Sequence, residues 1–288
     1  MNDTVMKNPA DRTASREGSP PQRNPERTSV LTWWDRLRGL QSPLLNLAGI
    51  AILLAVWQIC SATHMVDPAF ASSPWKILVA GRKLYSQGAI YTALGQTGKE
   101  FGIGELISIV AGTIIGLVIG ASRVLYDMTR GIVDVLYSVP HVLFLPVIIF
   151  WFGIGSTSRI IIVIWSGILP LVINTIAGSR ALNADYRRVS TAFCTPRFKR
   201  FYKVALPASL PFILSGVRLS VGRGLIGIIV AEFFMGSGGV GFFVQFHMSQ
   251  LDTSGAMAVI VTLCVVALLL NSLVAWCEKR FANWSISD

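Results

Sequence analysis

The sequence predicts an all-helical integral membrane protein with six transmembrane helices. Hydrophobic residues make up 52% of the chain and charged residues only 14%, and the mean hydropathy is +0.58. A soluble domain does not need so apolar a composition to fill its core. Six apolar runs, each long enough to cross a bilayer with about 20 residues, occupy much of the 288-residue chain. We therefore expect no second, soluble domain.

The predicted spans follow one another through short connections, except in two places. A polar connection covers residues 63 to 98 and holds one short helical run, at 75 to 85. A basic stretch, residues 179 to 211, separates the fourth span from the fifth. The spans are predicted at residues 44–62, 102–120, 132–152, 160–177, 212–234 and 256–276.

The two ends of the chain differ from its apolar middle. Residues 1–42 are rich in Pro, Ser, Arg and Asn and have almost no apolar periodicity, so we expect a disordered cytoplasmic tail. The membrane domain is predicted at 43–280, followed by a short cytoplasmic tail at 281–288. A glycine-rich segment at 235–255 is predicted to connect the last two spans on the outer side.

Glycines and prolines inside the spans indicate how the helices pack. Gly112, Gly116 and Gly120 recur every four residues, which places them on one face of a helix and lets a neighbouring backbone approach closely. Pro140 and Pro146 interrupt the third span and are expected to bend it. Because bent helices often line pathways, Pro140 is a candidate pathway residue.

The distribution of positive charge predicts which side of the membrane each loop occupies. Six spans place both termini on the same side. The N-terminal tail, a basic turn at 122–130, the stretch at 179–211 and the C-terminal end together carry eighteen Lys and Arg residues, whereas the opposite face carries five, including Arg159. Because positive residues gather in cytoplasmic loops, both termini and the basic stretch are predicted to be cytoplasmic. The same rule explains the net charge of +10, so we expect no nucleic-acid partner.

The basic stretch has the pattern of two short amphipathic helices. It holds seven Lys or Arg residues and one acid. A first helix is predicted at 184–193, and Thr195 and Pro196 then supply a cap and a first-turn proline for a second helix that ends before Pro207. Such a helix pair suits a position on the lipid headgroups or a docking contact with another protein, and the periodicity leaves both interpretations open.

Several charged residues within the predicted spans are expensive to place in hydrocarbon. Glu105 and Glu232 are each expected to face the protein interior or water, and Glu232 is a candidate pathway or gate residue. Arg218 and Arg223 are expected to snorkel or to pair with a carboxylate, although they would also suit an anionic substrate. His141 follows a proline in the third span and joins the candidate pathway residues.

We expect no enzymatic activity from this chain. Intramembrane hydrolases and transferases need a nucleophile paired with a base, or metal ligands at helical spacing. The sequence contains neither HExxH nor GxSxG, and its three histidines are scattered. We therefore assign no catalytic residue, metal or cofactor to it. Gly98 and Lys99 resemble the end of a phosphate-binding loop, but Ala93 stands where that loop begins with glycine, so any ATP-driven step needs a separate motor.

Three segments together carry a resemblance to a known family. They are the basic loop with its following helix, from Cys194 to Phe234, the two spans from Tyr137 to Gly178 with a Phe-Gly-Ile-Gly turn at 152–155, and the sequence MGSGGVGFFV at 235–244. In their order along the chain, these segments resemble permease subunits of ABC importers, specifically those of the nitrate, sulfonate and taurine type. The resemblance covers roughly residues 66 to 280.

This resemblance implies a fold, a function and partners. It implies a multi-pass protein of the bacterial cytoplasmic (inner) membrane with the type I ABC importer permease architecture, working as a homodimer. Two ATPase subunits would bind ATP and Mg on the cytoplasmic side, and a periplasmic or lipid-anchored binding protein would deliver a small solute such as a sulfonate, taurine or nitrate. The spans would open to each side in turn. From the residues alone, a channel or a secondary transporter that uses Glu105 or Glu232 stays an alternative.

The resemblance also assigns the basic stretch to ATPase coupling. Aligning the family's Leu-Pro on Leu206 and Pro207 places its Glu-Ala-Ala at residues 188–190 and its glycine at Cys194. Arg188 reverses the sign of the family's Glu, so we expect a matching acidic surface on the partner ATPase. The coupling-loop residues are Arg188, Val189, Ser190, Phe193, Cys194, Thr195, Pro196, Phe198, Phe201, Leu206 and Pro207.

Overall fold

The computed structural model describes residues 45, 47–63, 72–181 and 206–282. The chain divides into two compact units, residues 1–56 and residues 57–288. In the first unit the described residues form the beginning of an apolar helix, Leu47–Ala62, whose large aliphatic side chains are exposed. This helix lies within the first predicted span and is shorter than the four described helices that are long enough to cross a membrane.

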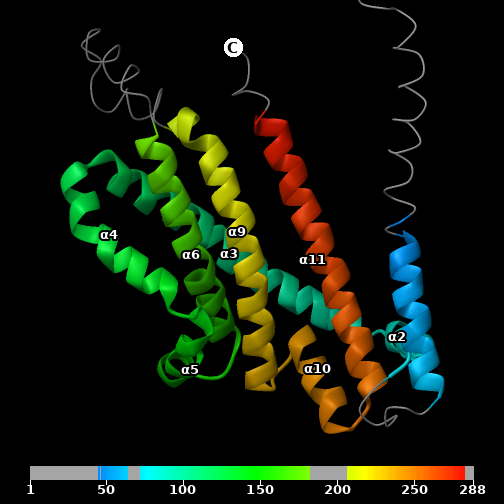
Figure 1. The fold of residues 1–288 in the computed structure, drawn as a ribbon. Coiled ribbons are helices and arrows are strands. Elements are labelled where there is room, and N and C mark those ends of the chain that lie inside the picture. The colour runs from blue at the N-terminus through cyan, green and yellow to red at the C-terminus, as the bar shows by residue number, and fades with distance from the viewer. Residues whose placement is uncertain (1–44, 46, 64–71, 182–205, 283–288) are drawn as a thin grey trace, which may run out of the picture. The chain divides into compact units, whose positions relative to one another are not determined.

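The described part of the second unit is built from helices and turns only (Figure 1). Four helices are long and apolar enough to cross a membrane, and a fifth span results if a bent helix pair is counted as one. The predicted all-helical fold is confirmed, but the described residues supply four or five candidate spans rather than six. The elements are α2 (Pro74–Ser86), α3 (Ala89–Ala121), α4 (Arg123–Ser138), η3 (His141–Phe144), α5 (Leu145–Phe152), α6 (Ser156–Arg180), α9 (Leu206–Met235), α10 (Val240–Ser249) and α11 (Thr253–Ala282).

Helix α6 packs along both α3 and α9 and forms the centre of the second unit. Glycines of α3 allow the first of these contacts. A Cβ atom on Gly112 would lie 2.8 Å from Leu171 Cβ, and one on Gly116 would lie 2.5 Å from Thr175 Cβ. Gly120 approaches α6 in the same way one turn further along. Because any side chain at these positions would push the helices apart, the glycines place α3 directly against α6.

Helix α3 begins earlier than the sequence predicts. The structure extends it back to Ala89, through a segment expected to belong to the polar connection at 63–98. Ile90 and Ala93 explain the difference, because both are buried in a core cluster with Val240 of α10. One face of this polar-looking segment therefore packs inside the protein, and those contacts hold it in the helix.

The third predicted span is broken rather than merely kinked. Helix α4 begins at Arg123, where the sequence predicts a basic turn, because the Ser122 hydroxyl caps it and accepts the N–H of Leu125 at 3.3 Å. Pro140 follows the end of α4 and disfavours helical backbone at the residue before it. The segment from η3 through α5 consequently departs from α4 at an angle of 89°.

The glycine-rich segment after α9 contains a tight turn and a helix that the sequence does not predict. Gly236, Gly238 and Gly239 have φ values of 60°, 72° and 81°, a left-handed backbone that residues with side chains rarely adopt. Helix α10 begins directly after this turn at Val240. The three glycines thus reverse the chain and return α10 to the side of α9.

Candidate functional site

The predicted coupling loop lies mostly outside the described residues. Its residues from Arg188 to Phe201 fall in the segment 182–205, so their roles stay predictions. Leu206 and Pro207 are the first two residues of α9, which begins before the predicted start at Phe212. A proline is tolerated there because its missing N–H would have no helical partner in the first turn. The described candidate site is the set of polar side chains gathered between the long helices.

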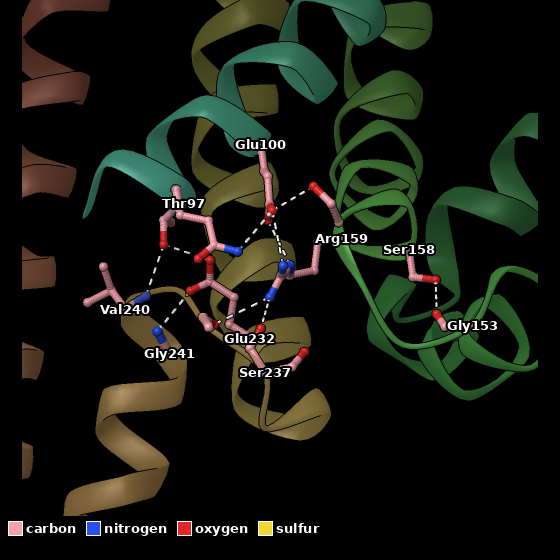
Figure 2. Close-up of polar contacts among 12 residues, drawn as sticks. Thr97, Glu100, Gly153, Ser158, Arg159, Glu232, Ser237, Val240 and Gly241 are labelled. Carbon is pink, nitrogen blue, oxygen red and sulfur yellow. Dashed lines mark hydrogen bonds and ion pairs between the residues drawn. The ribbon is translucent and has the colours of Figure 1, made fainter. Parts of the chain in front are cut away.

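The largest buried polar group joins α3, α6 and the turn after α9 (Figure 2). Arg159 of α6 forms an ion pair with Glu100 of α3, with Nε 2.7 Å from Oε2 and Nη2 3.0 Å from Oε1. Both side chains are only 4% exposed. The Ser156 hydroxyl donates to Oε1 of Glu100 at 2.6 Å. The bidentate contact between the guanidinium and the carboxylate offsets the cost of removing both charges from water.

The same guanidinium holds the glycine turn between α9 and α10. Nη1 of Arg159 donates to the carbonyl of Ser237 and, at 3.4 Å, to the carbonyl of Gly238 (Figure 2). Gly239 approaches Glu232 so closely that a Cβ atom there would overlap the carboxylate. A turn made of glycines permits such contact between backbone and buried charge. One arginine therefore connects α3, α6 and this turn.

Glu232 is the second carboxylate of this group and holds the start of α10. The Thr97 hydroxyl of α3 donates to its Oε1 at 2.6 Å, and the N–H of Gly241 donates to its Oε2 at 2.8 Å. Thr97 also accepts the N–H of Val240 at 3.0 Å. Glu232 is completely buried, which confirms that it faces the interior. Its bonds attach α10 to α3 and α9.

The sequence does not reveal most of this group. Neither Glu100 nor Thr97 is a predicted site residue, and Arg159 is counted among the charges of the outer face. Arg159 directly follows a polar turn, so the sequence suggests an exposed loop residue. In the structure it is buried in the first turn of α6. Only the pairing of Gln96 with Glu100 has a local sequence signal, because residues four apart lie on the same face of a helix. The Gln96 amide donates to Oε1 of Glu100 at 3.4 Å.

A second buried group lies where α3, α6 and α9 meet. Glu105 of α3 is 5% exposed, which confirms that it too faces the interior. Two glycines make room for its carboxyl group, because a Cβ atom on Gly224 of α9 would lie 3.0 Å from Oε2 and one on Gly167 of α6 would lie 3.2 Å from it. The hydroxyl of Ser220 also borders Gly167. Small residues thus enclose one carboxyl group among three apolar helices.

The two arginines of α9 have different surroundings. Nη1 of Arg218 lies 3.5 Å from Oε2 of Glu278 on α11, so a predicted carboxylate partner is present. Arg223 lies instead over the ring of Tyr137 on α4, with its guanidinium carbon 4.1 Å from the ring centroid. His141 stands just after the break that follows α4, and its Nε2 is buried without a hydrogen-bond partner among the described residues.

The fold and these groups define a helical, multi-pass membrane protein that buries its charges between helices. The described residues include no group of three or more His, Cys, Asp or Glu side chains able to hold a metal ion.

Residues 108–283 match the family described as binding-protein-dependent transport system inner membrane component. The match covers more than half of the chain, so the protein belongs to this family.

The chain is also similar to permeases with named substrates. It is 29% identical over 234 residues to the putative aliphatic sulfonates transport permease SsuC of Bacillus subtilis, covering 81% of this chain and 85% of that relative. Identity to the taurine transport system permease TauC of Escherichia coli is 25% over 245 residues, covering 83% and 89%. Identity to the bicarbonate transport system permease CmpB of Synechococcus elongatus is 28% over 273 residues, covering 90% and 95%.

An inward-facing structure of the MetNI methionine ABC transporter has a similar fold. Its TM-score with this chain is 0.58 at 18% sequence identity, and the match covers 70% of this chain and 98% of that one. At such low identity this likeness shows the fold alone. Together with the family match, it confirms the resemblance to ABC importer permeases. The chain is a transport subunit, and ATP hydrolysis belongs to a separate subunit in this class.

Proposed function

We propose that this chain forms the membrane pathway of an ATP-driven importer and translocates a small anion by alternating access. The family match over residues 108–283 carries the proposal. The names of most of these relatives support the substrate class, because aliphatic sulfonates, taurine, nitrate and bicarbonate all carry an anionic oxygen group at neutral pH, whereas one relative is named for formylaminopyrimidine. The substrate of this chain is therefore expected to be a small oxyanion or a compound with such a group.

The proposed assembly contains two copies of this chain, with the pathway between them, in a bacterial inner membrane. Two ATPase subunits bind ATP and Mg and contact the coupling loop at 179–211. A solute-binding protein, periplasmic or lipid-anchored, delivers the substrate at the opposite face. This chain itself holds no cofactor.

The proposed topology has six spans with both termini in the cytoplasm. The helix at 47–62 supplies the first span, and α4 with η3 and α5 supplies the third. Because Arg159 is buried in an ion pair, only four of the five positive residues counted for the outer face are left there. The excess of positive residues on the predicted cytoplasmic side is therefore larger than the sequence count suggests.

Cysteine labelling tests this topology. In a cysteine-free background, Ser19→Cys should react with a membrane-impermeant reagent added from the cytoplasmic side, and Gln87→Cys with the same reagent added from outside.

Five residues enter the proposal as candidate pathway or gate residues: Glu232, Arg218, Arg223, His141 and Pro140. The hydrogen bonds of Glu232 support a structural role near the α10 turn, and the ion pair of Arg218 with Glu278 supports a tie between α9 and α11. We therefore assign the pathway role to Arg223 and His141, beside the break at Pro140.

Reconstitution tests the proposal against its main rival. The chain, its ATPase and its binding protein are placed in proteoliposomes, and uptake of radiolabelled taurine, ethanesulfonate, nitrate and bicarbonate is measured one by one. An importer takes up one of them only when ATP and binding protein are both present. Uptake without ATP, driven by a proton gradient and abolished by Glu105→Gln, would instead establish a secondary transporter.

A further inference from the structure

Arg223 is a charged residue deep within a membrane helix. Along α9 it lies about 25 Å from Leu206 and about 18 Å from Met235, at about 1.5 Å per residue. A guanidinium at such a depth is costly unless it meets a counter-charge, water or a ligand. Arg223 is only half-buried, so its charged group is not sealed inside the protein.

Two other arginines of the central helices have carboxylate partners, whereas Arg223, like Arg180 at the end of α6, lies over a tyrosine ring and has no carboxylate partner within the described part of the chain. Arg159 is paired with Glu100, and Arg218 with Glu278. The nearest partner recorded for Arg223 is the aromatic face of Tyr137. A cation over an aromatic ring gains some energy, but the ring accepts none of the guanidinium's in-plane hydrogen bonds. The five N–H donors of Arg223 are left available to a ligand.

His141 supplies a second donor beside this cation. Helix α9, which carries Arg223, contacts η3, which begins at His141. The Nε2 atom of His141 is buried and has no hydrogen-bond partner among the described residues. At the other end of η3, Phe144 packs edge-to-face against Trp165 of α6, with ring centroids 4.9 Å apart. This contact holds η3, and His141 with it, in place.

Arg223 of α9 lies over the ring of Tyr137 near the end of α4, and His141 begins η3 four residues later, where the third span breaks by 89°. Together they present a fixed positive charge and an imidazole nitrogen, with no carboxylate of the described residues paired to either. Charge-assisted hydrogen bonds to oxygen are the strongest that such donors make, and a guanidinium matches two oxygens of one group. The complementary ligand is a small anion with at least two acceptor oxygens.

We propose that Arg223 and His141 bind the transported anion inside the membrane, at the break between α4 and η3, with the Tyr137 ring orienting the guanidinium. The inference rests on the proposed function, because it takes the ligand to be the importer's substrate. A lipid phosphate offers the same oxygens, but the depth of Arg223 along α9 favours a solute that enters from the pathway.

The test uses the complete transporter in proteoliposomes, with the same four compounds, each of which carries an anionic oxygen group, as probes. Arg223→Gln should slow uptake of the transported anion about tenfold or more, because the charge and the paired donors are both lost. Arg223→Lys keeps the charge but not the planar donors, so we expect an intermediate rate. His141→Leu, which removes the second donor, should slow uptake about threefold or more. Arg123→Gln is the matched control, because it removes an exposed arginine of α4 that pairs with Asp127 of the same helix, and it should stay within about twofold of wild type.

Each outcome separates this inference from the proposed function. If the wild-type transporter takes up none of the four compounds with ATP, the proposed function loses its support. If it transports one of them and both Arg223→Gln and His141→Leu do so at the wild-type rate, only the anion site is overturned. If Arg223→Gln fails to assemble, Arg223→Lys and His141→Leu carry the test, and wild-type rates in both overturn the site.

The lipid alternative is tested by changing the vesicles. Uptake by wild type and Arg223→Gln is compared in vesicles of phosphatidylcholine alone and in vesicles with one third phosphatidylglycerol. A solute site predicts the same defect in both. A defect that appears only with the anionic lipid would mean that Arg223 binds a headgroup phosphate, and would overturn the proposal.

Discussion

The Nε atom of Arg159 lies 2.7 Å from Oε2 of Glu100, and this contact joins the first turn of α6 to the N-terminal half of α3. Both charges are removed from water, which good geometry and further hydrogen bonds must offset. Ser156 and the carbonyls of the glycine turn supply those bonds. The pair therefore fixes two helices and the turn that leads into α10.

Removing Arg159 is expected to be strongly destabilising. Arg159→Gln leaves the Glu100 carboxylate uncompensated in the interior, which typically costs about 3–5 kcal/mol. Unfolding of the purified protein in detergent, followed by tryptophan fluorescence, measures the loss. Glu100→Gln should also destabilise, and the double variant should lose less than the two single variants together. Strictly additive losses would contradict a direct interaction between the two side chains.

The glycine stripe of α3 gives a prediction with an internal control. Gly116→Ala places a Cβ atom 2.5 Å from Thr175 Cβ and 2.9 Å from the carbonyl of Val172, and overpacking of this kind costs about 1–3 kcal/mol. Gly102→Ala changes the same helix at a position with no atom within 4 Å. It should be neutral or stabilising by up to about 1 kcal/mol, because alanine is the better helix former. Equal thermal stability of the two variants would show that α3 does not contact α6 through Gly116.

The sequence predicts most of the helices, because their signals are local. Helix α2, the long apolar helices α6, α9 and α11, and the turn at 152–155 all follow from hydrophobic runs bounded by turn residues. The start of α3 does not, because Ile90 and Ala93 are held by residues of α10 and α11 that lie far along the chain. The break at Pro140 is visible as a proline, but only the structure gives its 89° angle.

The candidate site is less predictable than the helices for the same reason. Glu105 and Glu232 stand out as acids in apolar runs, and the structure buries both. The partner of Arg159 is 59 residues away, and no spacing rule connects the two. The stacking of Arg223 on Tyr137 likewise depends on how α4 folds back against α3 and α6. Polar groups can be recognised one at a time in the sequence, whereas their pairing depends on the packed helices.

Asp252, between α10 and α11, is expected to make stability depend on pH. Burial alone would raise its pKa, but the N–H of Gly255, the His247 side chain and the charge of Lys83 together hold the pKa of Asp252 below its usual value. A carboxylate whose pKa is lower in the folded state makes its full contribution to the stability of the fold at pH values above its unfolded-state pKa of about 3.9. That contribution is lost as the pH falls through the folded-state value.

Two variants separate this charge effect from helix capping, because Oδ1 of Asp252 accepts the N–H of Gly255 at 2.9 Å. Asp252→Asn keeps a capping oxygen, so its stability should fall less steeply than that of wild type between about pH 5 and pH 3. Asp252→Ala removes the cap as well and should cost about 1 kcal/mol at pH 7. Thermal unfolding at several pH values measures both. Parallel pH profiles for wild type and Asp252→Asn would show that this carboxylate does not contribute.

Arg188 gives a prediction about ATPase coupling. It stands where the family resemblance places a glutamate, so its native ATPase is expected to present an acidic surface to it. Arg188→Glu would bring like charges together, and we expect substrate-stimulated ATP hydrolysis with the native ATPase to fall about tenfold, since like charges across an interface are costly. Arg187→Glu makes the same change in net charge at the neighbouring position and should have a smaller effect. Full stimulated activity in Arg188→Glu would mean that this contact does not depend on charge.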